Sequence, residues 1–564
     1  MIEFKNISRS RAQESSAAIE RMYITMRHLF NRGFYKPMGV SGDTLREALL
    51  LLRPEIYGSI ADEKVELNGL LYVIERLPVG IEECRFVNLT SDEGYSRSHF
   101  KAIVPPKRKR NCYRIDEEQM NVEITRGRSD IYDILTHLTF LFIESHKIKQ
   151  KALIDDSNPE MSRDWQKLEQ VVFLNKKLTD LEREKAISHA SNLLGRSFAE
   201  VLDIYNGFAT SEKPDRFLHV IYWLGKLAIE EVTDNKKRMI TFSPMLRERL
   251  GHHIHGEIWA NNIKETLKAN GLLGRPIHVI SANMHSVMNS IFAVPALKGK
   301  LKGVADYTVY EELSKSGAHE LRDIVTEVAL KNGMISLPDN SGTNIDVQVF
   351  DTAQIDWSKT SFPKTKSAKS APVLIVMDYA FGEQAFETLD ELSKPFKNGD
   401  EKLFLNIESV SIMGKAGILE GGKGDIMIPN AHINEGTADN YPFDNELRAE
   451  DLEGHGIPVY AGPMVSVLGT SLQNKDLLKF FHDSSWGAIG LEMEGAYYQK
   501  AIQSASKIRK SIHPNVKVRY AYYASDNPLE TGSTLASGGL GTTGVKPTYL
   551  ITIKILEQIF ITKS

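Results

Sequence analysis

The sequence predicts an α/β protein: a mixed sheet flanked by helices over residues 271–564, preceded by a mainly helical domain over residues 1–270. Three observations lead to this. The 564 residues exceed the roughly 250–300 that one hydrophobic core supports. In the first part, apolar residues recur three and four positions apart, as in amphipathic helices. In the second part, short β-rich runs alternate with helical patterns, which is typical of a sheet covered on both faces.

The N-terminal domain is expected to hold long helices and one β-leaning patch near Leu67–Ile81. Ser243 is a suitable N-cap and Pro244 a suitable first residue for a helix that ends near Gly251. Nothing in this domain indicates its role. The other expected helices lie within Ser129–Lys149, Thr179–Tyr205 and Arg216–Val232.

The domain boundary is placed near Gly271–Pro276, where glycines and a proline end the preceding helix. Beyond it, the segment Ser358–Ser370, rich in Ser and Lys, is expected to be a surface loop. The expected strands are Ile277–Ser281, Val373–Met377, Val410–Met413, Asp425–Ile428, Ala488–Leu491 and Val516–Ala524.

The composition is that of an ordinary globular protein, with 42% hydrophobic and 25% charged residues and a net charge of -4. It favours neither a membrane nor a nucleic-acid partner, and the basic run Lys107–Arg110 is expected to be a solvated loop. The N-terminus has no apolar stretch of a secretory signal. Because Cys84 and Cys112 are the only cysteines, a disulfide framework is excluded and a cytoplasmic location is expected.

The strongest chemical signal is Glu492-Met493-Glu494, at the end of an expected strand and before a small-residue helix start. In a strand, Glu492 and Glu494 would share one face and Met493 the other. A carboxylate at a strand's C-terminal end is well placed to accept hydrogen bonds from a ribose diol, with methionine as an apolar floor. A charged helix cap is the plainer alternative.

A second acid follows another expected strand, in Ser525-Asp526. If burial raises its pKa, Asp526 can give a proton to the nitrogen of a departing base. A turn or helix cap is the ordinary alternative. A third signal is the glycine-containing segment Met413–Leu419, where Gly414 lets the backbone approach a ligand closely and Lys415 adds a positive charge.

Taken together, the residues from about 277 to 556 resemble the nucleoside phosphorylase superfamily, particularly its methylthioadenosine/adenosylhomocysteine nucleosidase branch. Residues 414–419 are similar to that family's Gly-Ser-Ala-Gly-Gly-Leu turn, and Gly424-Asp425 to its Gly-Asp. Residues 462–481 resemble the segment that supplies the purine pocket, 491–496 the Val-Glu-Met-Glu-Gly-Ala motif, and 525–526 its Ser-Asp pair. The two-domain plan is similar to that of AMP nucleosidases.

The resemblance implies roles for these residues. Glu494 would hold the ribose hydroxyls and stabilise an oxocarbenium-like transition state, and Asp526 would protonate purine N7. The remaining ribose- and base-binding residues would be Glu492, Met493, Ser525, Val467 and Leu468. No cofactor and no metal are required. Superfamily members usually assemble, so a homo-oligomer is expected.

The chain departs from the family where the nucleosidases carry Gly-Ala-Met-Glu-Glu-Glu, whose last glutamate activates water. Here the matching segment contains Asn283, His285 and Ser286, with Ser286 at the position of that base. His285 is a candidate base or a capping residue, whereas Asn283 and Ser286, with Gly414 and Lys415, are candidates for an anion or nucleophile side. The loop Thr531–Thr543 is either a phosphate cradle or a surface lid.

The histidines of His252-His253-x-His255 do not share a helix face, so structural roles are expected for them rather than metal binding. The leading hypothesis is therefore an enzyme that splits the N-glycosidic bond of a purine nucleoside or 5′-nucleotide, with water or phosphate as nucleophile. The alternative is a catalytically reduced nucleoside- or nucleotide-binding sensor, favoured by the missing glutamate.

Overall fold

The computed structural model describes residues 2–108, 110–155, 159–174, 177–301, 306–363, 371–435, 437, 439–530 and 541–560, without the side chains of 2–10, 306 and 398. Its contacts divide the chain into two compact units. The first comprises Met1–Thr125, Asp130–His252 and Gly469–Leu477, and the second comprises Arg126–Ser129, His253–Leu468 and Leu478–Ser564. Two short segments, Arg126–Ser129 and Gly469–Leu477, thus belong to a different unit from their neighbours in sequence. The sequence-based division at residue 270 stays a prediction.

The first unit combines helices with a sheet. Its helices are α1 (Ile2–Arg32), α2 (Val40–Leu52), α3 (Leu67–Ile74), α4 (Gly127–Ala152, whose first turn lies in the second unit), α5 (Arg163–Val172), α6 (Asp180–Leu194), α7 (Phe198–Tyr205), α8 (Arg216–Thr233) and α9 (Pro244–Gly251). Among the described residues, the sheet has the order β1-β6-β2-β5-β4-β3, with β1 (Phe34–Tyr35), β2 (Phe86–Thr90), β3 (Ala102–Ile103), β4 (Cys112–Arg114), β5 (Gln119–Glu123) and β6 (Met239–Phe242).

Helix α9 begins at the residue that the sequence marks as a cap. Ser243 Oγ accepts the Leu246 N–H at the start of α9, which ends at Gly251 as predicted. The predicted segment Thr179–Tyr205 contains two helices, α6 and α7, because Gly195 adopts the left-handed conformation between them. Helices α4 and α8 cover the two other predicted segments.

Two predictions for the first unit are wrong. The patch Leu67–Ile81 begins as helix α3, since the Glu66 side chain caps its first turn and its apolar residues fill a buried helix face; a short apolar run does not by itself distinguish helix from strand. Lys107 of the basic run is exposed in a turn, as expected, but Arg108 and Arg110 are paired rather than solvated. Arg110 is buried with Nη2 2.6 Å from carboxylate oxygens of Asp130 and Asp133, and Arg108 Nε lies 3.3 Å from Asp133.

The second unit contains the mixed sheet that the sequence predicts. Its order is β15-β14-β16-β17-β13-β7-β10-β9-β8, and β18 pairs with both β13 and β14. The strands are β7 (Ile277–Ser281), β8 (Met334–Leu337), β9 (Val347–Asp351), β10 (Val373–Met377), β13 (Ile407–Ile418), β14 (Ile426–Asn434), β15 (Asn440–Pro442), β16 (Val459–Ser466), β17 (Gly490–Glu492) and β18 (Lys517–Asp526). Strands β10, β7, β13 and β18 run parallel, in that order, so their C-terminal ends meet at one edge.

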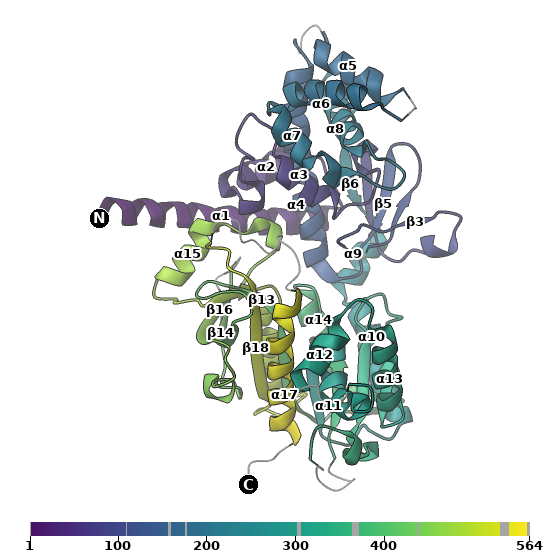
Figure 1. Ribbon diagram of the computed structural model, residues 1–564, viewed down its shortest axis with the longest axis vertical. Helices are drawn as coiled ribbons and strands as arrows, with labels where there is room; N and C mark the ends of the chain where they lie inside the picture. Colours follow the sequence, from purple (N-terminus) through teal and green to yellow (C-terminus); the bar gives the residue numbers. More distant parts are fainter. Residues whose placement is uncertain are drawn as a thin grey trace. The chain divides into compact units, whose positions relative to one another are not determined.

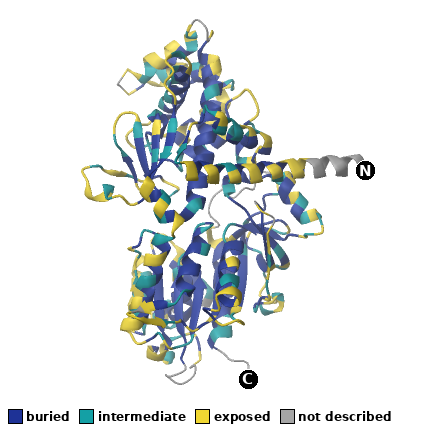
Figure 2. Ribbon diagram, turned by 180° about the vertical axis from the view of Figure 1, so that it is seen from behind, coloured by how far each residue is buried: buried dark blue, intermediate teal, exposed yellow. Residues whose placement is uncertain are grey.

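Helices cover both faces of this sheet, as predicted (Figure 1). Alternate residues of β7 and β10 enter opposite hydrophobic cores: Val279 and Ile375 pack in one, Ile280 and Val376 in the other. Strands β7 and β10 are buried throughout, while the helices expose their outer sides (Figure 2). None of the described helices is long and apolar enough to cross a membrane. The first core receives α10 (Ile254–Ala269), α14 (Gln384–Ser393) and α16 (Gly495–Gln503), and the second α11 (Met284–Leu297), α12 (Asp306–Ser314), α13 (His319–Leu330) and α17 (Val545–Phe560).

Helices α10 and α14 meet at a buried glutamate. Glu387 accepts the Gly256 N–H at 3.2 Å, and burial, opposed by that hydrogen bond, raises the pKa of Glu387 to about 7. Because the folded state holds this proton more tightly than the unfolded chain, stability falls as pH rises from about 4.5 to 7 and the full cost persists above 7.

Glu387→Gln is therefore expected to stabilise the protein by about 2–3 kcal/mol at pH 8 and by much less at pH 4.5. Urea unfolding at both pH values measures the difference. The exposed Glu327→Gln, which carries the same change, serves as control. Equal effects of Glu387→Gln at the two pH values would contradict the assignment.

Candidate functional site

The loop that follows β10 connects two of the predicted site residues. Its Tyr379 ring covers Gly414 of β13, where a Cβ would lie 3.3 Å from the ring. The Tyr379 hydroxyl is hydrogen-bonded to the backbone of Asn283, after β7, and to Tyr523 of β18. Asn283 and Gly414 are thereby held beside one another at the C-terminal ends of the parallel strands, where α/β sheets bind ligands.

The same loop contacts Glu494. The Gly382 N–H donates to Glu494 Oε1 at 3.0 Å. Glu494 is half-buried at the N-cap of α16, and burial, together with the nearby Glu492 carboxylate, raises the pKa of Glu494 to about 8. One turn further on, the Tyr498 hydroxyl lies 2.9 Å from Ser281 Oγ at the end of β7.

Glu492 does not share a strand face with Glu494, in contrast to the prediction. Strand β17 ends at Glu492, and the chain then turns into α16. The Glu492 carboxylate accepts the N–H groups of Glu494, at 2.6 Å, and of Gly495, and also the Ser466 hydroxyl. Glu492 thus fixes the backbone of the turn that presents Glu494. The helix-cap alternative describes its contacts correctly.

His432, which the sequence analysis did not single out, completes this turn. Its Nδ1 lies 3.3 Å from Glu492 Oε1, and its fully buried ring packs against Phe443 and Tyr520. Burial alone would raise the pKa of Glu492, but the imidazole, the Ser466 hydroxyl and the Gly495 N–H lower it below its usual value. Glu492 is therefore an ionised anchor, whereas Glu494 holds its proton more tightly.

Gly495 is required because the imidazole occupies the space of a side chain. A Cβ there would lie 2.3 Å from His432 Cε1. Gly495→Ala is expected to destabilise the protein by about 1–3 kcal/mol in denaturant unfolding. The double variant Gly495→Ala/His432→Ala is expected to be more stable than the sum of the two single changes predicts, because the ring has gone. Additive effects would argue against this contact.

Asp526 ends β18 with only 1% of the residue exposed. The Ser525 hydroxyl lies 2.6 Å from Asp526 Oδ1 and 3.0 Å from the Ala416 carbonyl oxygen. Asp526 Oδ2 is buried and has no hydrogen-bond partner among the described residues. Burial raises the pKa of Asp526, although the Ser525 hydroxyl and the charges of Lys423 and Lys415 oppose this.

The two acidic segments flank one residue of β13. Gly417 is the register partner of Leu491 in β17 and of Asp526 in β18. With neighbouring strands about 4.8 Å apart, the backbones at Leu491 and Asp526 lie roughly 10 Å apart across Gly417. Glu494 follows Leu491 by three residues, so the structure brings the two predicted catalytic carboxyl groups to the same part of the sheet.

The predicted base-binding residues follow β16 and β17. The Val467 N–H donates to the Glu492 carbonyl at 2.8 Å, and the Leu468 N–H donates to Glu435 Oε2 at 3.4 Å. Both residues are buried and Met493 is half-buried. Glu435, which the sequence analysis also missed, is buried, and burial raises its pKa to about 8 although the Leu468 N–H opposes this.

Of the residues predicted to bind the nucleophile or an anion, only some lie together in the structure. Asn283 Oδ1 caps α11 by accepting the His285 N–H at 3.0 Å, and the His285 side chain is exposed. Ser286 is buried, and its hydroxyl donates to the Asn283 carbonyl at 2.7 Å, so it is engaged in packing rather than presented to an anion. Lys415 is exposed. Residues 531–540 of the predicted phosphate loop lie outside the described residues.

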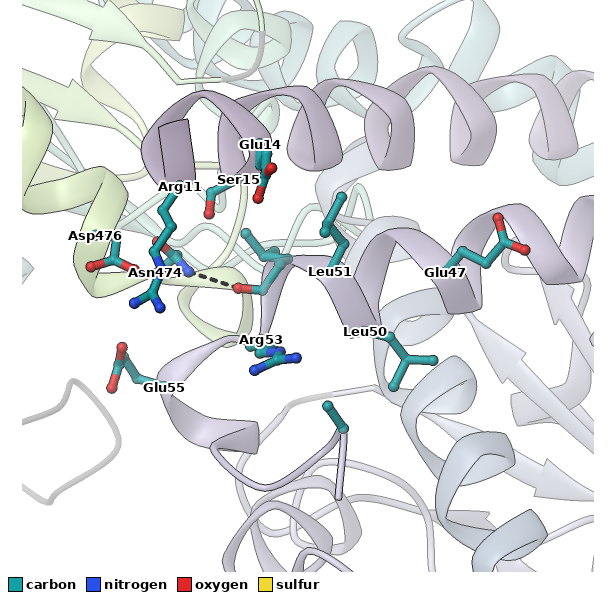
Figure 3. Close-up of a pocket in the computed structure, with 12 residues that line it drawn as sticks. Arg11, Glu14, Ser15, Glu47, Leu50, Leu51, Arg53, Glu55, Asn474 and Asp476 are labelled. Carbon is teal, nitrogen blue, oxygen red and sulfur yellow. Dashed lines mark hydrogen bonds between the residues drawn. The ribbon is translucent and has the colours of Figure 1, made fainter. Parts of the chain in front are cut away.

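A histidine cluster and a cavity lie apart from the candidate site and contribute no residue to it. His253 lies near Asp390 and Glu391, but Lys394 and Arg509 already pair with these carboxylates. His255 Nδ1 lies 2.8 Å from the Ser341 carbonyl oxygen. In the first unit, a cavity of about 730 Å³ is lined by charged and apolar side chains of α1, α2 and the segment Gly469–Leu477, and contains none of the predicted site residues (Figure 3).

A mixed sheet with acidic residues at its strand ends defines an α/β protein with a candidate ligand site there. The chain belongs to a family of unknown function, DUF6909, whose model matches residues 43–300 and 298–561. No curated protein matches the chain.

Solved structures give weak likenesses. Futalosine hydrolase of Helicobacter pylori strain 26695 aligns at 13% identity over 50% of this chain and 98% of its own, with a TM-score of 0.30. The 5′-methylthioadenosine/S-adenosyl homocysteine nucleosidase of Campylobacter jejuni aligns at 11% identity over 51% and 100%, with a TM-score of 0.31. The corresponding Neisseria meningitidis enzyme, solved with methylthio-immucillin-A, aligns at 11% over 50% and 99%, with a TM-score of 0.30. These scores are too low to support a function, which must be argued from the site.

Proposed function

We propose that this protein cleaves the N-glycosidic bond of a purine nucleoside or 5′-nucleotide and releases the free base. The observation that carries the proposal is the pair of carboxyl groups at Asp526, a register partner of Gly417, and Glu494, three residues after the other partner Leu491. Both carboxyl groups have raised pKa values. Raised carboxyl pKa values at strand ends are typical of acid–base sites.

The two groups have different tasks. Asp526 Oδ2, buried and without a partner among the described residues, gives a proton to purine N7 and so makes the base a better leaving group. Glu494, in its ionised form, accepts the ribose hydroxyls and stabilises the positive charge that develops on the sugar. The turn fixed by Glu492 holds Glu494 in place, while Ser525, Met493, Val467 and Leu468 line the base and ribose.

The second candidate function is a catalytically reduced sensor that binds a nucleoside or nucleotide. The observation that favours it is the state of the segment where the nucleosidases carry their water-activating glutamate. There Ser286 is engaged in packing and the His285 side chain is exposed. Such a protein would bind the sugar through Glu494 without breaking the bond.

The deciding experiment is incubation of the full chain with AMP, adenosine, inosine and methylthioadenosine, each with and without phosphate. Free base is measured by chromatography and ligand binding by calorimetry. The enzyme proposal expects base release from at least one compound. Binding without base release would establish the sensor, and neither binding nor release would overturn both functions.

A further inference from the structure

A third acidic residue, Asp378, begins the loop whose Gly382 N–H donates to Glu494. Asp378 is the first residue after β10, and β10 runs parallel to β7 with Met377 opposite Ser281. The Ala282 N–H donates to the Met377 carbonyl at 3.0 Å, so the two strand ends are hydrogen-bonded where Asp378 begins its loop. The residues from Ala282 to Val287 that follow β7 include no acid, so Asp378 is the acidic residue at this pair of strand ends.

The surroundings of Asp378 leave its carboxylate accessible. Its Oδ1 accepts the Tyr379 N–H at 2.9 Å, and its own N–H donates to the Asp346 carbonyl at 3.1 Å, which fixes the backbone. Asp378 is half-buried, and its Oδ2 has no hydrogen-bond partner among the described residues. A general base requires this combination of a fixed main chain and an oxygen that can accept a proton.

Tyr498 connects Asp378 with the proposed site. Its hydroxyl lies 2.9 Å from Ser281 Oγ and is hydrogen-bonded to the backbone of Ala380. Burial raises the pKa of Tyr498, and the charges of both Glu494 and Asp378 raise it further. The loop itself also links the two acids, because Asp378 begins it and its Gly382 N–H donates to Glu494 Oε1 at 3.0 Å.

We propose that Asp378 is the general base that activates the attacking water, an inference that rests on the proposed function. Asp378 takes a proton from water as its oxygen forms a bond to C1′ of the ribose. The bond from C1′ to purine N9 breaks, its electron pair leaves with the base, and Asp526 protonates N7. The products are the free base and the ribose or ribose 5-phosphate. In the same step Glu494 holds the ribose hydroxyls and Asp526 activates the base, as in the proposed function.

The test compares Asp378→Asn with the unchanged protein and with Asp346→Asn, a matched change at the residue whose carbonyl Asp378 contacts. For the compound that the unchanged protein cleaves, Asp378→Asn is expected to lower kcat ~10²–10³-fold with KM changed less than about threefold. Asp346→Asn is expected to keep kcat within about threefold. Circular dichroism and thermal melting establish that each variant is folded.

A second measurement separates a base from a merely structural residue. Azide is a nucleophile that needs no deprotonation, so it is expected to restore base release in Asp378→Ala and to form the ribosyl azide, without accelerating the unchanged protein. Full activity of Asp378→Asn, or a folded Asp378→Ala that binds ligand but does not respond to azide, would overturn the role of Asp378 alone. Failure of the unchanged protein to release base from any compound would overturn the proposed function and this inference together.

Discussion

Asp526→Asn is expected to lower the rate of base release ~10²–10⁴-fold while the protein still binds its nucleoside ligand. Asparagine has nearly the shape of the acid and can accept the Ser525 hydroxyl in the same way, but it has no proton to give to N7. Because burial raises the pKa of Asp526, the unchanged protein loses its proton donor as pH rises above that pKa. The ionised form of Glu494 is reached only as pH approaches about 8, so base release is expected to be greatest between the two pKa values.

The measurement is kcat for free-base release from pH 5 to 9, with ligand affinity determined by calorimetry. Asp444→Asn, the same change at an exposed residue of the same unit, is the control and is expected to behave like the unchanged protein. If Asp526→Asn released base at the normal rate, Asp526 would not be the acid. If it lost binding as well as rate, its role would be in holding the base.

Glu494→Gln is expected to have opposite effects on activity and on stability. Base release should fall ~10²-fold or more, because glutamine cannot stabilise a developing positive charge on the sugar. The folded protein holds the Glu494 proton up to a pKa of about 8, so its stability declines as pH rises from about 4.5 to 8. Glutamine removes that decline.

Above pH 8 we expect Glu494→Gln to be about 2 kcal/mol more stable than the unchanged protein, a value reduced for solvent screening because Glu494 is only half-buried. Below pH 4.5 the two proteins should be equally stable. Urea unfolding at pH 4.5 and pH 8.5 measures this difference, and the chromatographic assay measures activity. If the variant were less stable than the unchanged protein at pH 8.5, the ionised Glu494 carboxylate would not destabilise the folded state.

The helices and strands that could be predicted are those whose signals are local. Ser243 and Pro244 mark the start of α9, and the apolar runs of β7 and β10 are bounded by their own flanking residues. The prediction for Leu67–Ile81 was wrong because its signal is not local. The apolar run alone allows either a helix or a strand, and the Glu66 side chain together with tertiary packing favours the helix.

The residues of the candidate site also fall into those with a local sequence signal and those that only folding brings together. Glu494 and Asp526 could be found because each follows a strand and belongs to a motif of contiguous residues. His432 lies far from Glu492 in sequence, and only folding brings its ring to that carboxylate. Asp378 and Tyr379 lie in a loop with no motif, and their importance follows from the order of strands in the sheet rather than from any local pattern.

The segment Gly469–Leu477 has a consequence for how such a protein can evolve. It directly follows the predicted base-binding residues Val467 and Leu468, yet its contacts belong to the first unit: Thr470 meets Tyr72, and the Asn474 amide donates to the Leu52 carbonyl. Joining a foreign domain at residue 252 would therefore leave this segment without its partners. The two halves of the gene must change together, so we expect them to be inherited as one piece rather than shuffled as independent modules.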